Sequence, residues 1–321
     1  MRMKKLLYIF LIISLFGCHN DIPSHNVIIT RCKDIPVGRA HAMAWSANGQ
    51  GYILGGRDSV GVLHNDVWAY DPKSDTWKKI EDSPLTARVN GTACAVGEKI
   101  YLGLGFHQRP YQSSAYLQDW WEYTPLTNEW RRLQDFPNKN TVGAVSYTQD
   151  NKIYCVHGSG VGFTADVIAY DIANNQWEII NRPHRNDRMG MAGTGTSLHN
   201  RHYYGTGFNT NNFKSWYEVE LDGPWIRLAD VPGEREMATC VSTDKYLYLL
   251  GGRRFGGTLT TGRLYNDVLC FHTDKNQWHK VGTTSECAEN RFAFTIDGVA
   301  YVGGGENDNT GILNTLYRIE D

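Results

Sequence analysis

An aromatic signature returns along this chain at intervals of about fifty residues, and it constrains the fold more than any other feature. In each copy a tryptophan closes a short strand-like segment. An aromatic residue stands seven positions earlier in four copies and eight positions earlier in the fourth copy along the chain. The tryptophans are Trp77, Trp130, Trp177, Trp225 and Trp278. A fixed period of this length is typical of similar units arranged in a ring or a stack.

Each repeat is predicted to form a small antiparallel sheet. Residues 91–96 and 99–104 are hydrophobic strands joined by a two-residue turn, and residues 119–123 and 129–133 follow as a second pair. Past the N-terminus no segment shows the sustained period of 3.6 residues that indicates a helix. Six hydrophobic strands run into glycine clusters, the last at residues 300–305. Because one such sheet cannot bury both of its faces, we expect an all-β propeller of six blades.

The last repeat lacks a tryptophan of its own, and the N-terminal segment is predicted to complete it. Residues 27–31, followed by Pro36 and Arg39, match the segment that starts at Trp77 and is followed by Pro84 and Arg88. We therefore expect residues 27–32 to form the outer strand of the last blade, whose inner strands lie at about 291–319. One domain would then cover residues 27–321 and be closed by pairing of the two chain ends.

These repeats resemble the kelch family. Each begins with a hydrophobic strand and a diglycine, continues with an Asn-Asp-Val stretch, and ends on the aromatic signature. The matching stretches are Leu54-Gly55-Gly56, Asn65-Asp66-Val67, Tyr70-Asp71 and Trp77, and later Leu250-Gly251-Gly252 and Asn266-Asp267-Val268. The resemblance implies a six-bladed kelch β-propeller. It leaves the function open, because propellers serve as enzymes, glycan binders and protein adaptors alike.

The N-terminus is predicted to be an export signal. Basic residues at positions 2–5 precede an apolar run over residues 6–16, which is short for a transmembrane helix. The four residues that end at Cys18 resemble a bacterial lipobox, which implies cleavage before Cys18 and lipid attached to it. Residues 1–17 would then be the signal peptide and residues 18–26 a lipidated tether. This implies a membrane-anchored protein of the bacterial cell envelope, facing the periplasm or the outside, with the outer membrane as its expected place. Plain secretion is the alternative.

Charge and cysteine content narrow the function classes. The formal net charge is −2, and it becomes −5 without the three basic residues of the leader, which argues against nucleic-acid binding. The six cysteines after the leader show no metal-site spacing, and neither a cofactor nor a metal is expected. Most should be buried free thiols, with Cys32 and Cys287 as the one candidate disulfide pair.

Two sets of side chains are candidate ligand-binding residues. Strand alternation places the loop between the second and third strands of every blade on the same face as the crossovers between blades, and these loops are long and polar. They contribute Arg57, His107, Arg109, Asn209 and Arg253. A second set stands where the first strands begin, and it consists of Arg39, Arg88, Arg188, Arg235 and Arg291. Guanidinium groups there could bind a carboxylate, or they could hold neighbouring loops and backbone carbonyls.

Two enzymatic interpretations follow from resemblance. Copper oxidases of the galactose oxidase type share kelch repeats, but no histidine spacing here indicates their metal site. Residues 189–207 and 232–268 look more like blades of bacterial sialic-acid epimerases (mutarotases), although in a different chain order. That family places a glutamate after a blade glycine and an arginine six residues later. Glu306 follows Gly305 in this way, but Ile312 stands at the arginine position.

Glu306 is therefore the candidate catalytic base, with Arg291 or Arg39 as its expected partner across the channel. The acidic loop at residues 306–309 could instead bind Ca²⁺ or be a solvated turn. The leading hypothesis is an envelope module that binds a ligand, most naturally a glycan. The alternatives are an epimerase acting on sialic acid or a related acidic sugar, and a scaffold for protein partners.

Overall fold

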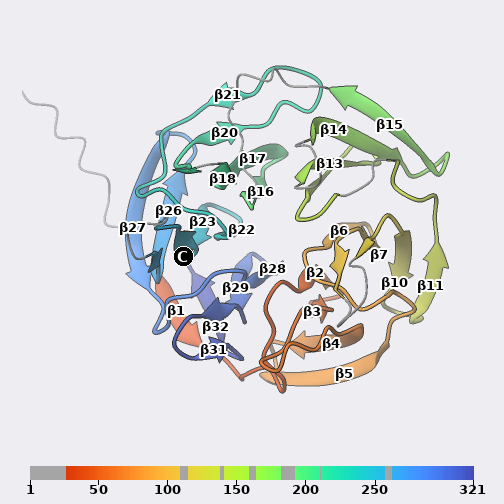
Figure 1. Cartoon of the computed structure of the whole chain (residues 1–321), viewed down its shortest axis with the longest axis horizontal. Coiled ribbons are helices and arrows are strands. Elements are labelled where there is room, and N and C mark those ends of the chain that lie inside the picture. Colours follow the sequence, from red (N-terminus) through yellow and green to blue (C-terminus); the bar gives the residue numbers. More distant parts are fainter. Residues whose placement is uncertain are drawn as a thin grey trace, which may run out of the picture.

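The computed structural model describes residues 27–108, 115–137, 141–158, 164–181, 192–209, 211–256 and 262–321. Six four-stranded antiparallel sheets stand around a central axis as the blades of a propeller (Figure 1). The predicted six-bladed kelch-type propeller is confirmed. The predicted signal peptide, the tether and Cys18 lie outside the described residues. Within the described part of the chain, no helix is long and apolar enough to cross a membrane.

The blades are numbered in chain order, and their strands run from the axis outward. Blade 1 contains β2 (Met43–Ala47), β3 (Gln50–Leu54), β4 (Asp66–Asp71) and β5 (Thr76–Asp82). Blade 2 contains β6 (Thr92–Val96), β7 (Lys99–Gly103), β10 (Trp120–Thr124) and β11 (Glu129–Arg132). Blade 3 contains β12 (Val145–Gln149), β13 (Lys152–Gly158), β14 (Thr164–Asp171) and β15 (Gln176–Asn181).

The second half of the ring repeats this order. Blade 4 contains β16 (Thr194–Leu198), β17 (Arg201–Gly205), β20 (Trp216–Glu218) and β21 (Ile226–Arg227). Blade 5 contains β22 (Thr239–Ser242), β23 (Leu247–Leu250), β26 (Asp267–His272) and β27 (Gln277–Thr283). Blade 6 contains β28 (Phe292–Ile296), β29 (Val299–Gly303) and β32 (Leu316–Glu320), and its outer strand is β1 (Ile28–Arg31).

The N-terminal strand closes the ring as predicted. β1 pairs antiparallel with β32, so that Ile29 lies opposite Ile319. The side chain of Ile319 is fully buried, and Ile29 packs against the same hydrophobic cluster between blades 5 and 6. The closing strand therefore contributes to the core as well as to the sheet.

The aromatic signature has a structural cause, because in blades 1, 3 and 5 it joins the blade by hydrogen bonds to the segment that follows the outer strand of the blade before it. Asp75 has a positive φ, and its Oδ1 accepts hydrogen bonds from the Tyr70 hydroxyl and from the Lys33 N–H, both at 2.8 Å. Trp77 Nε1 donates in turn to the Lys33 carbonyl, at 3.0 Å. The same reciprocal contact joins Asn175 and Trp177 to Gln134, and Asn276 and Trp278 to Ala229.

The cysteines follow the prediction except for the candidate pair. All six described cysteines are free, so the proposed Cys32–Cys287 disulfide is wrong. Cys32 lies just after β1 and beside Tyr70 of blade 1, whereas Cys287 lies in the crossover that leads into β28. The other four are buried, as expected of small hydrophobic side chains in inner strands.

Candidate functional site

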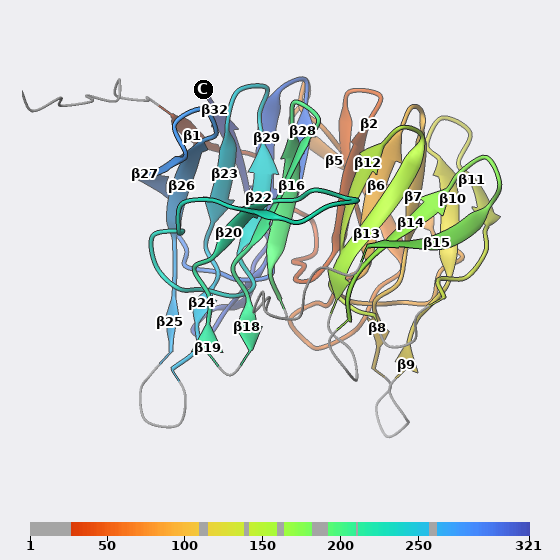
Figure 2. The same cartoon turned by 90° about the horizontal axis from the view of Figure 1, so that it is seen from above.

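Four two-stranded hairpins extend from the blades on one face of the propeller (Figure 2). They are β8 (Phe106–His107) with β9 (Ala115–Tyr116), β18 (Phe208–Asn209) with β19 (Asn211–Asn212), β24 (Arg253–Arg254) with β25 (Arg263–Leu264), and β30 (Glu306–Asn307) with β31 (Gly311–Ile312). Backbone bridges join the base of three of them to the crossover that leads into the same blade. The loops between second and third strands thus meet the crossovers on one face, as the strand alternation predicts.

A ring of residues with left-handed backbone surrounds the channel mouth on this face. One residue from each crossover takes part, and its φ lies between 54° and 68°. Their N–H groups donate to the carbonyl of the next member at 2.8–3.1 Å, in the order Gly143, Asn90, His41, Asn290, Met237 and Ala192. Such φ values are unfavourable for most residues with side chains, and they tend to occur at functional sites.

The ring frames a cavity of about 330 Å³ at the channel mouth. Gly143 and Ala192 line one side, where they leave space, and His41, Asn90 and Asn290 line the other with hydrogen-bonding groups. Glu236 and Met237 from blade 5 complete the wall. The cavity is therefore polar on one side and lined mainly by small residues on the other, and its size suits a small molecule.

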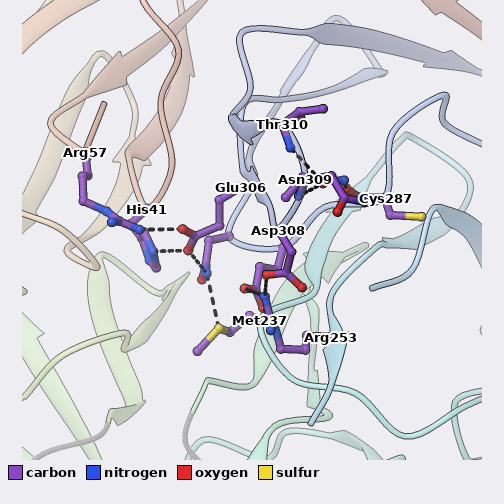
Figure 3. A network of polar contacts seen from close by, with 12 residues as sticks. His41, Arg57, Met237, Arg253, Cys287, Glu306, Asp308, Asn309 and Thr310 are labelled. Atoms are coloured by element: carbon purple, nitrogen blue, oxygen red, sulfur yellow. Dashed lines mark hydrogen bonds and ion pairs between the residues drawn. The ribbon is translucent and has the colours of Figure 1, made fainter. Parts of the chain in front are cut away.

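Glu306 is held on the polar side of this cavity by three neighbours from two blades (Figure 3). His41 Nε2 lies 2.8 Å from Glu306 Oε1, and Asn290 Nδ2 donates to the same oxygen at 3.0 Å. Arg57 Nη2 donates to Oε2 at 2.5 Å. The preceding residue, Gly305, has a φ of +94°, and a Cβ there would lie 2.6 Å from the Glu289 carbonyl, so only glycine lets Glu306 approach this closely.

These contacts decide the charge of Glu306. Burial alone would raise its pKa, but the hydrogen bond from His41 and the attraction of His41 and Arg57 outweigh burial and lower the pKa to about 2. Glu306 is therefore a carboxylate at neutral pH. The predicted partners are corrected here, because Glu306 is bound by Arg57 and His41 of blade 1 rather than by Arg291 or Arg39.

A second ionic cluster lies beside the first, on blades 5 and 6. Arg253 binds both oxygens of Glu289, at 2.9 and 2.8 Å, and also binds Asp308 at 2.6 Å (Figure 3). Burial raises the pKa of Glu289, and the hydrogen bond from Arg253 opposes this rise. The acidic loop that was a candidate for Ca²⁺ thus directs Glu306 and Asp308 toward arginines of blades 1 and 5.

Three arginines of the second predicted set are engaged inside the blades. Arg39 binds Asp66 at 2.7 Å, Arg88 binds both oxygens of Asp119 at 2.7 Å, and Arg235 binds both oxygens of Asp267 at 2.7 and 2.9 Å. Their exposed fractions are 1% or less. These bonds favour the structural role, since the guanidinium groups already have carboxylate partners within their own blades.

Arg291 of blade 6 differs from these three. Thr315 stands where blades 1, 2 and 5 carry the aspartate. The predicted equivalence of Arg291 is wrong, because Arg291 directly precedes its first strand, whereas the other three arginines stand four positions before theirs. Among the described residues, Arg291 donates to the carbonyls of Gly304 and Glu286, at 3.2 and 3.1 Å. The Thr315 hydroxyl is buried without a hydrogen-bond partner. Burial lowers the pKa of Arg291, partly opposed by Tyr317 and Glu286. Arg291 also lines the cavity at the channel mouth.

The remaining predicted residues lie at the rim or outside the described part of the chain. His107 Nδ1 lies 2.5 Å from the Ala87 carbonyl, and Asn209 belongs to the short β18–β19 hairpin. Arg109 and Arg188 lie outside the described residues. Across the described ranges, no three His, Cys, Asp or Glu side chains gather as a metal ion would require.

The sequence interpretation missed the side chains of the left-handed ring. His41, Asn90 and Asn290 each stand two positions before the first strand of their blade, and Glu236 and Glu289 stand three positions before it. This register could have been found by aligning the repeats on the starts of their first strands. The polar residues concentrate in blades 1, 2, 5 and 6, and so they mark one side of the channel mouth.

The chain belongs to the kelch-repeat family. The family described as "KLHDC2/KLHL20/DRC7 Kelch-repeats domain" matches residues 24–208, and the Kelch motif matches residues 234–285. The solved structure titled "Structure of YjhT" superimposes with a TM-score of 0.76 at 16% identity, covering 90% of this chain and 99% of that one. This likeness concerns the fold.

Curated relatives include a kelch-like protein and N-acetylneuraminate epimerases. Kelch-like protein 25 of Xenopus tropicalis is 23% identical over 77% of this chain and 41% of its own length. N-acetylneuraminate epimerase 1 of Escherichia coli O6:H1 is 27% identical over 58% of this chain and 45% of its own length. N-acetylneuraminate epimerase of Haemophilus influenzae PittEE is 23% identical over 70% of this chain and 76% of its own length. The chain thus spans less than half of the first two relatives.

Proposed function

We propose that this kelch propeller is a mutarotase that equilibrates the anomers of an acidic sugar, N-acetylneuraminate or a related 2-keto sugar acid. The observation that carries the proposal is the Glu306–Arg57 pair beside the cavity at the channel mouth. It brings together a carboxylate and a guanidinium from different blades, although Ile312 occupies the sequence position where the epimerases are expected to carry arginine. Relatives named N-acetylneuraminate epimerase support the choice of sugar.

The chemistry of the sugar explains why these two groups should be adjacent. In a cyclic 2-keto sugar acid, the anomeric carbon carries both the carboxylate and the hydroxyl that must lose a proton. A cation that binds the carboxylate therefore also places the hydroxyl within hydrogen-bond reach of a neighbouring base, about 2.6–3.2 Å. Arg57, whose side chain is 38% exposed, is accessible to the sugar carboxylate, and Glu306 is the adjacent base.

The reaction needs one proton removed and one supplied. Glu306 takes the proton of the anomeric hydroxyl, the bond between the anomeric carbon and the ring oxygen breaks, and the ring oxygen takes up a proton. The open-chain keto acid rotates and closes on its other face, which returns both protons. When the sugar carboxylate takes over hydrogen bonds from Arg57, Glu306 loses part of the attraction that lowers its pKa, and so it becomes a stronger base.

Binding without turnover is the second candidate, and aromatic side chains on the hairpins of blades 4 and 5 favour it. Phe208 and Phe255 form an edge-to-face pair with ring centroids 5.5 Å apart, and Phe255 is 53% exposed. Beside them, Asn212 Oδ1 accepts the Phe255 N–H. Exposed aromatic rings next to amides suit the apolar faces and hydroxyls of a sugar, so this surface also fits a glycan-binding module. A scaffold for protein partners has no specific observation of this kind in its favour.

Anomer exchange measured by NMR separates these functions. The protein is mixed with freshly dissolved N-acetylneuraminate, and anomeric equilibration and saturation transfer are followed in one sample. We predict acceleration over the buffer control, and a loss of about 10²–10⁴-fold in Glu306→Gln, as expected when a general base is removed. Glu122→Gln is the matched control, because the pKa of Glu122 is also lowered to about 2 but by Arg131, Lys99 and Tyr101 in blade 2, away from the cavity.

Each outcome has a distinct meaning. Saturation transfer without acceleration would reject the mutarotase and support the binding module. Neither effect would reject this sugar and turn the search toward other glycans and protein partners. Equal activity in Glu306→Gln and wild type would remove Glu306 from the mechanism.

We also propose that the propeller is anchored to a bacterial envelope membrane through lipid on Cys18. The chain enters β1 at Ile28, opposite Glu320, on the face that lies away from the small hairpins (Figure 2). A tether that leaves from this face favours a site directed away from the membrane. Release of a Cys18→Ala variant from the membrane fraction would support the anchor, and unchanged membrane association would contradict it.

A further inference from the structure

Glu236 differs from the other carboxyl residues at the channel mouth, because it has no cation partner among the described residues. Glu236 is 7% exposed and lines the cavity. Its acidic neighbours are neutralised, because Glu289 is bound by Arg253 and Glu306 by Arg57. Glu236 forms no ion pair with any residue that the structure describes, although its backbone pairs with that of Arg253. A buried carboxyl without a cation that faces a cavity is costly to maintain unless it is protonated or a ligand meets it.

Its surroundings favour the protonated form. Burial is the main cause that raises the pKa of Glu236, and the nearby charge of Glu289 raises it further. The amide of Asn212 and the charge of Arg253 act in the opposite direction without cancelling the rise. Asn212 is itself 7% exposed, and its Oδ1 accepts the Phe255 N–H. Glu236 therefore has a polar amide beside it but no cation partner among the described residues.

Glu236 and Glu306 lie on neighbouring blades of the same wall. Glu236 immediately precedes Met237 of the left-handed ring, and Asn290 Nδ2 lies 3.3 Å from Met237 Sδ. The same Asn290 amide donates to Glu306. The Asn290 amide thus joins Glu306 to the residue that follows Glu236. The pKa of Glu289 responds to the charge of Glu306, and the pKa of Glu236 responds to that of Glu289.

We infer that Glu236 is the second catalytic carboxyl of the mutarotation and donates the proton that the ring oxygen takes up. This inference rests on the proposed function. As Glu306 accepts the anomeric proton, the bond between the anomeric carbon and the ring oxygen breaks, its electron pair stays on the oxygen, and the Glu236 proton moves to that oxygen. Ring closure runs these transfers backward and restores both groups, so no other reactant is consumed.

Two carboxyl groups with oppositely shifted pKa values are suited to this division of work. The group whose pKa is lowered serves as the base, and the group whose pKa is raised serves as the acid. The pH dependence follows in sign: activity needs Glu236 protonated, so it should fall as the pH rises through the raised pKa of this residue. The neighbours that shift the pKa of Glu236, besides its burial, are Glu289, Arg253 and Asn212.

The test is the pH profile of anomer exchange of N-acetylneuraminate, corrected for the buffer rate at each pH. We expect Glu236→Gln to lower the rate about 10²-fold and to abolish the fall at higher pH, because an amide neither donates this proton nor titrates. Glu234→Gln is the matched control, since Glu234 is exposed two positions away, and it should keep the wild-type profile. The thermal midpoint should not fall in Glu236→Gln, because no ion pair is lost.

The outcomes separate this inference from the proposed function. A wild type that accelerates exchange, with a Glu236→Gln variant equal to it in rate and profile, would overturn the inference and leave the mutarotase standing. A wild type without acceleration would overturn both. If Glu236→Gln fails to fold, Glu236→Asp is examined instead. That variant keeps a titrating acid but shortens its reach, so it should lose rate and retain the fall at higher pH, and full rate would contradict the inference.

Discussion

Blades 2 and 6 carry the same repeat, yet they use its two key positions differently. In blade 2 the arginine Arg88 is bound by Asp119, and the residue after the blade glycine is Phe106, which packs on Tyr116. In blade 6 Thr315 stands at the aspartate position, Arg291 donates to the carbonyls of Gly304 and Glu286, and the residue after the glycine is Glu306. Where the repeat keeps its usual chemistry it supports the fold, and where it departs from that chemistry it forms the site.

The largest effect should come from breaking the buried ion pair between Arg88 and Asp119 in blade 2. Asp119→Ala leaves the buried Arg88 charge without its carboxylate, which typically costs about 3–5 kcal/mol. The corresponding change in blade 6, Thr315→Ala, removes only an unbonded hydroxyl and should alter stability by less than about 1 kcal/mol. Urea unfolding of both variants measures the difference, and equal losses would show that the two blades are not distinct in this respect.

A gain of stability is expected when an arginine–aspartate ion pair is created in blade 6. Thr315→Asp should place a carboxylate beside Arg291, as Asp119 lies beside Arg88, and a hydrogen bond to a charged group contributes about 1.5–3 kcal/mol. The unfolding midpoint should rise. An unchanged or lower midpoint would mean that Glu286 already stabilises the buried charge of Arg291, so that a second carboxylate adds nothing.

Low pH should lower the stability of the protein through one carboxylate in blade 2 and one in blade 6, Glu122 and Glu306. The pKa values of Glu122 and Glu306 are both lowered from 4.5 to about 2, so their stabilising contribution is complete above pH 4.5 and is lost as the pH falls toward 2. The differences in thermal midpoint between wild type and Glu122→Gln or Glu306→Gln should therefore shrink over this range. A difference that stays constant down to pH 2 would contradict the lowered pKa of that residue.

The smallest effect concerns the contact between outer strands. Asp75→Ala removes the acceptor of the Tyr70 hydroxyl and of the Lys33 N–H, and we expect a loss of about 1 kcal/mol. Because the contact joins blade 1 to the closing strand, hydrogen exchange of the β1 amides should also quicken. Unchanged exchange in β1 would indicate that its pairing with β32 alone holds the strand.

The fold was predictable because its signals are local and repeated. The seven-residue spacing of Trp77 from Pro84 reappears between Ile29 and Pro36, and an arginine follows in both segments, which was enough to predict that the N-terminal strand completes blade 6. The aromatic signature could be recognised before its cause was known. The hydrogen bonds around Asp75 explain that cause only once two blades are placed side by side.

The site was predictable only in part. Glu306, Arg57 and Arg253 stand out as charged residues after blade glycines, but their pairing depends on which blades adjoin and on how each hairpin leans. Glu306 was therefore assigned the wrong partners. His41 and Asn290 escaped notice because no glycine marks their left-handed backbone. Glu236 has no cation partner among the described residues because Arg253 binds Glu289 instead, and no spacing in the sequence predicts this.

The central claim is that the departures from the repeat in blade 6, together with Arg57 of blade 1, form a site that acts on an acidic sugar. The most direct measurement is the rate of anomeric equilibration of N-acetylneuraminate with wild type and with Arg57→Ala, which removes the cation but leaves Glu306. The account predicts acceleration by wild type and a large loss in the variant, with weaker saturation transfer to the sugar. Equal rates for wild type, Arg57→Ala and buffer would contradict it.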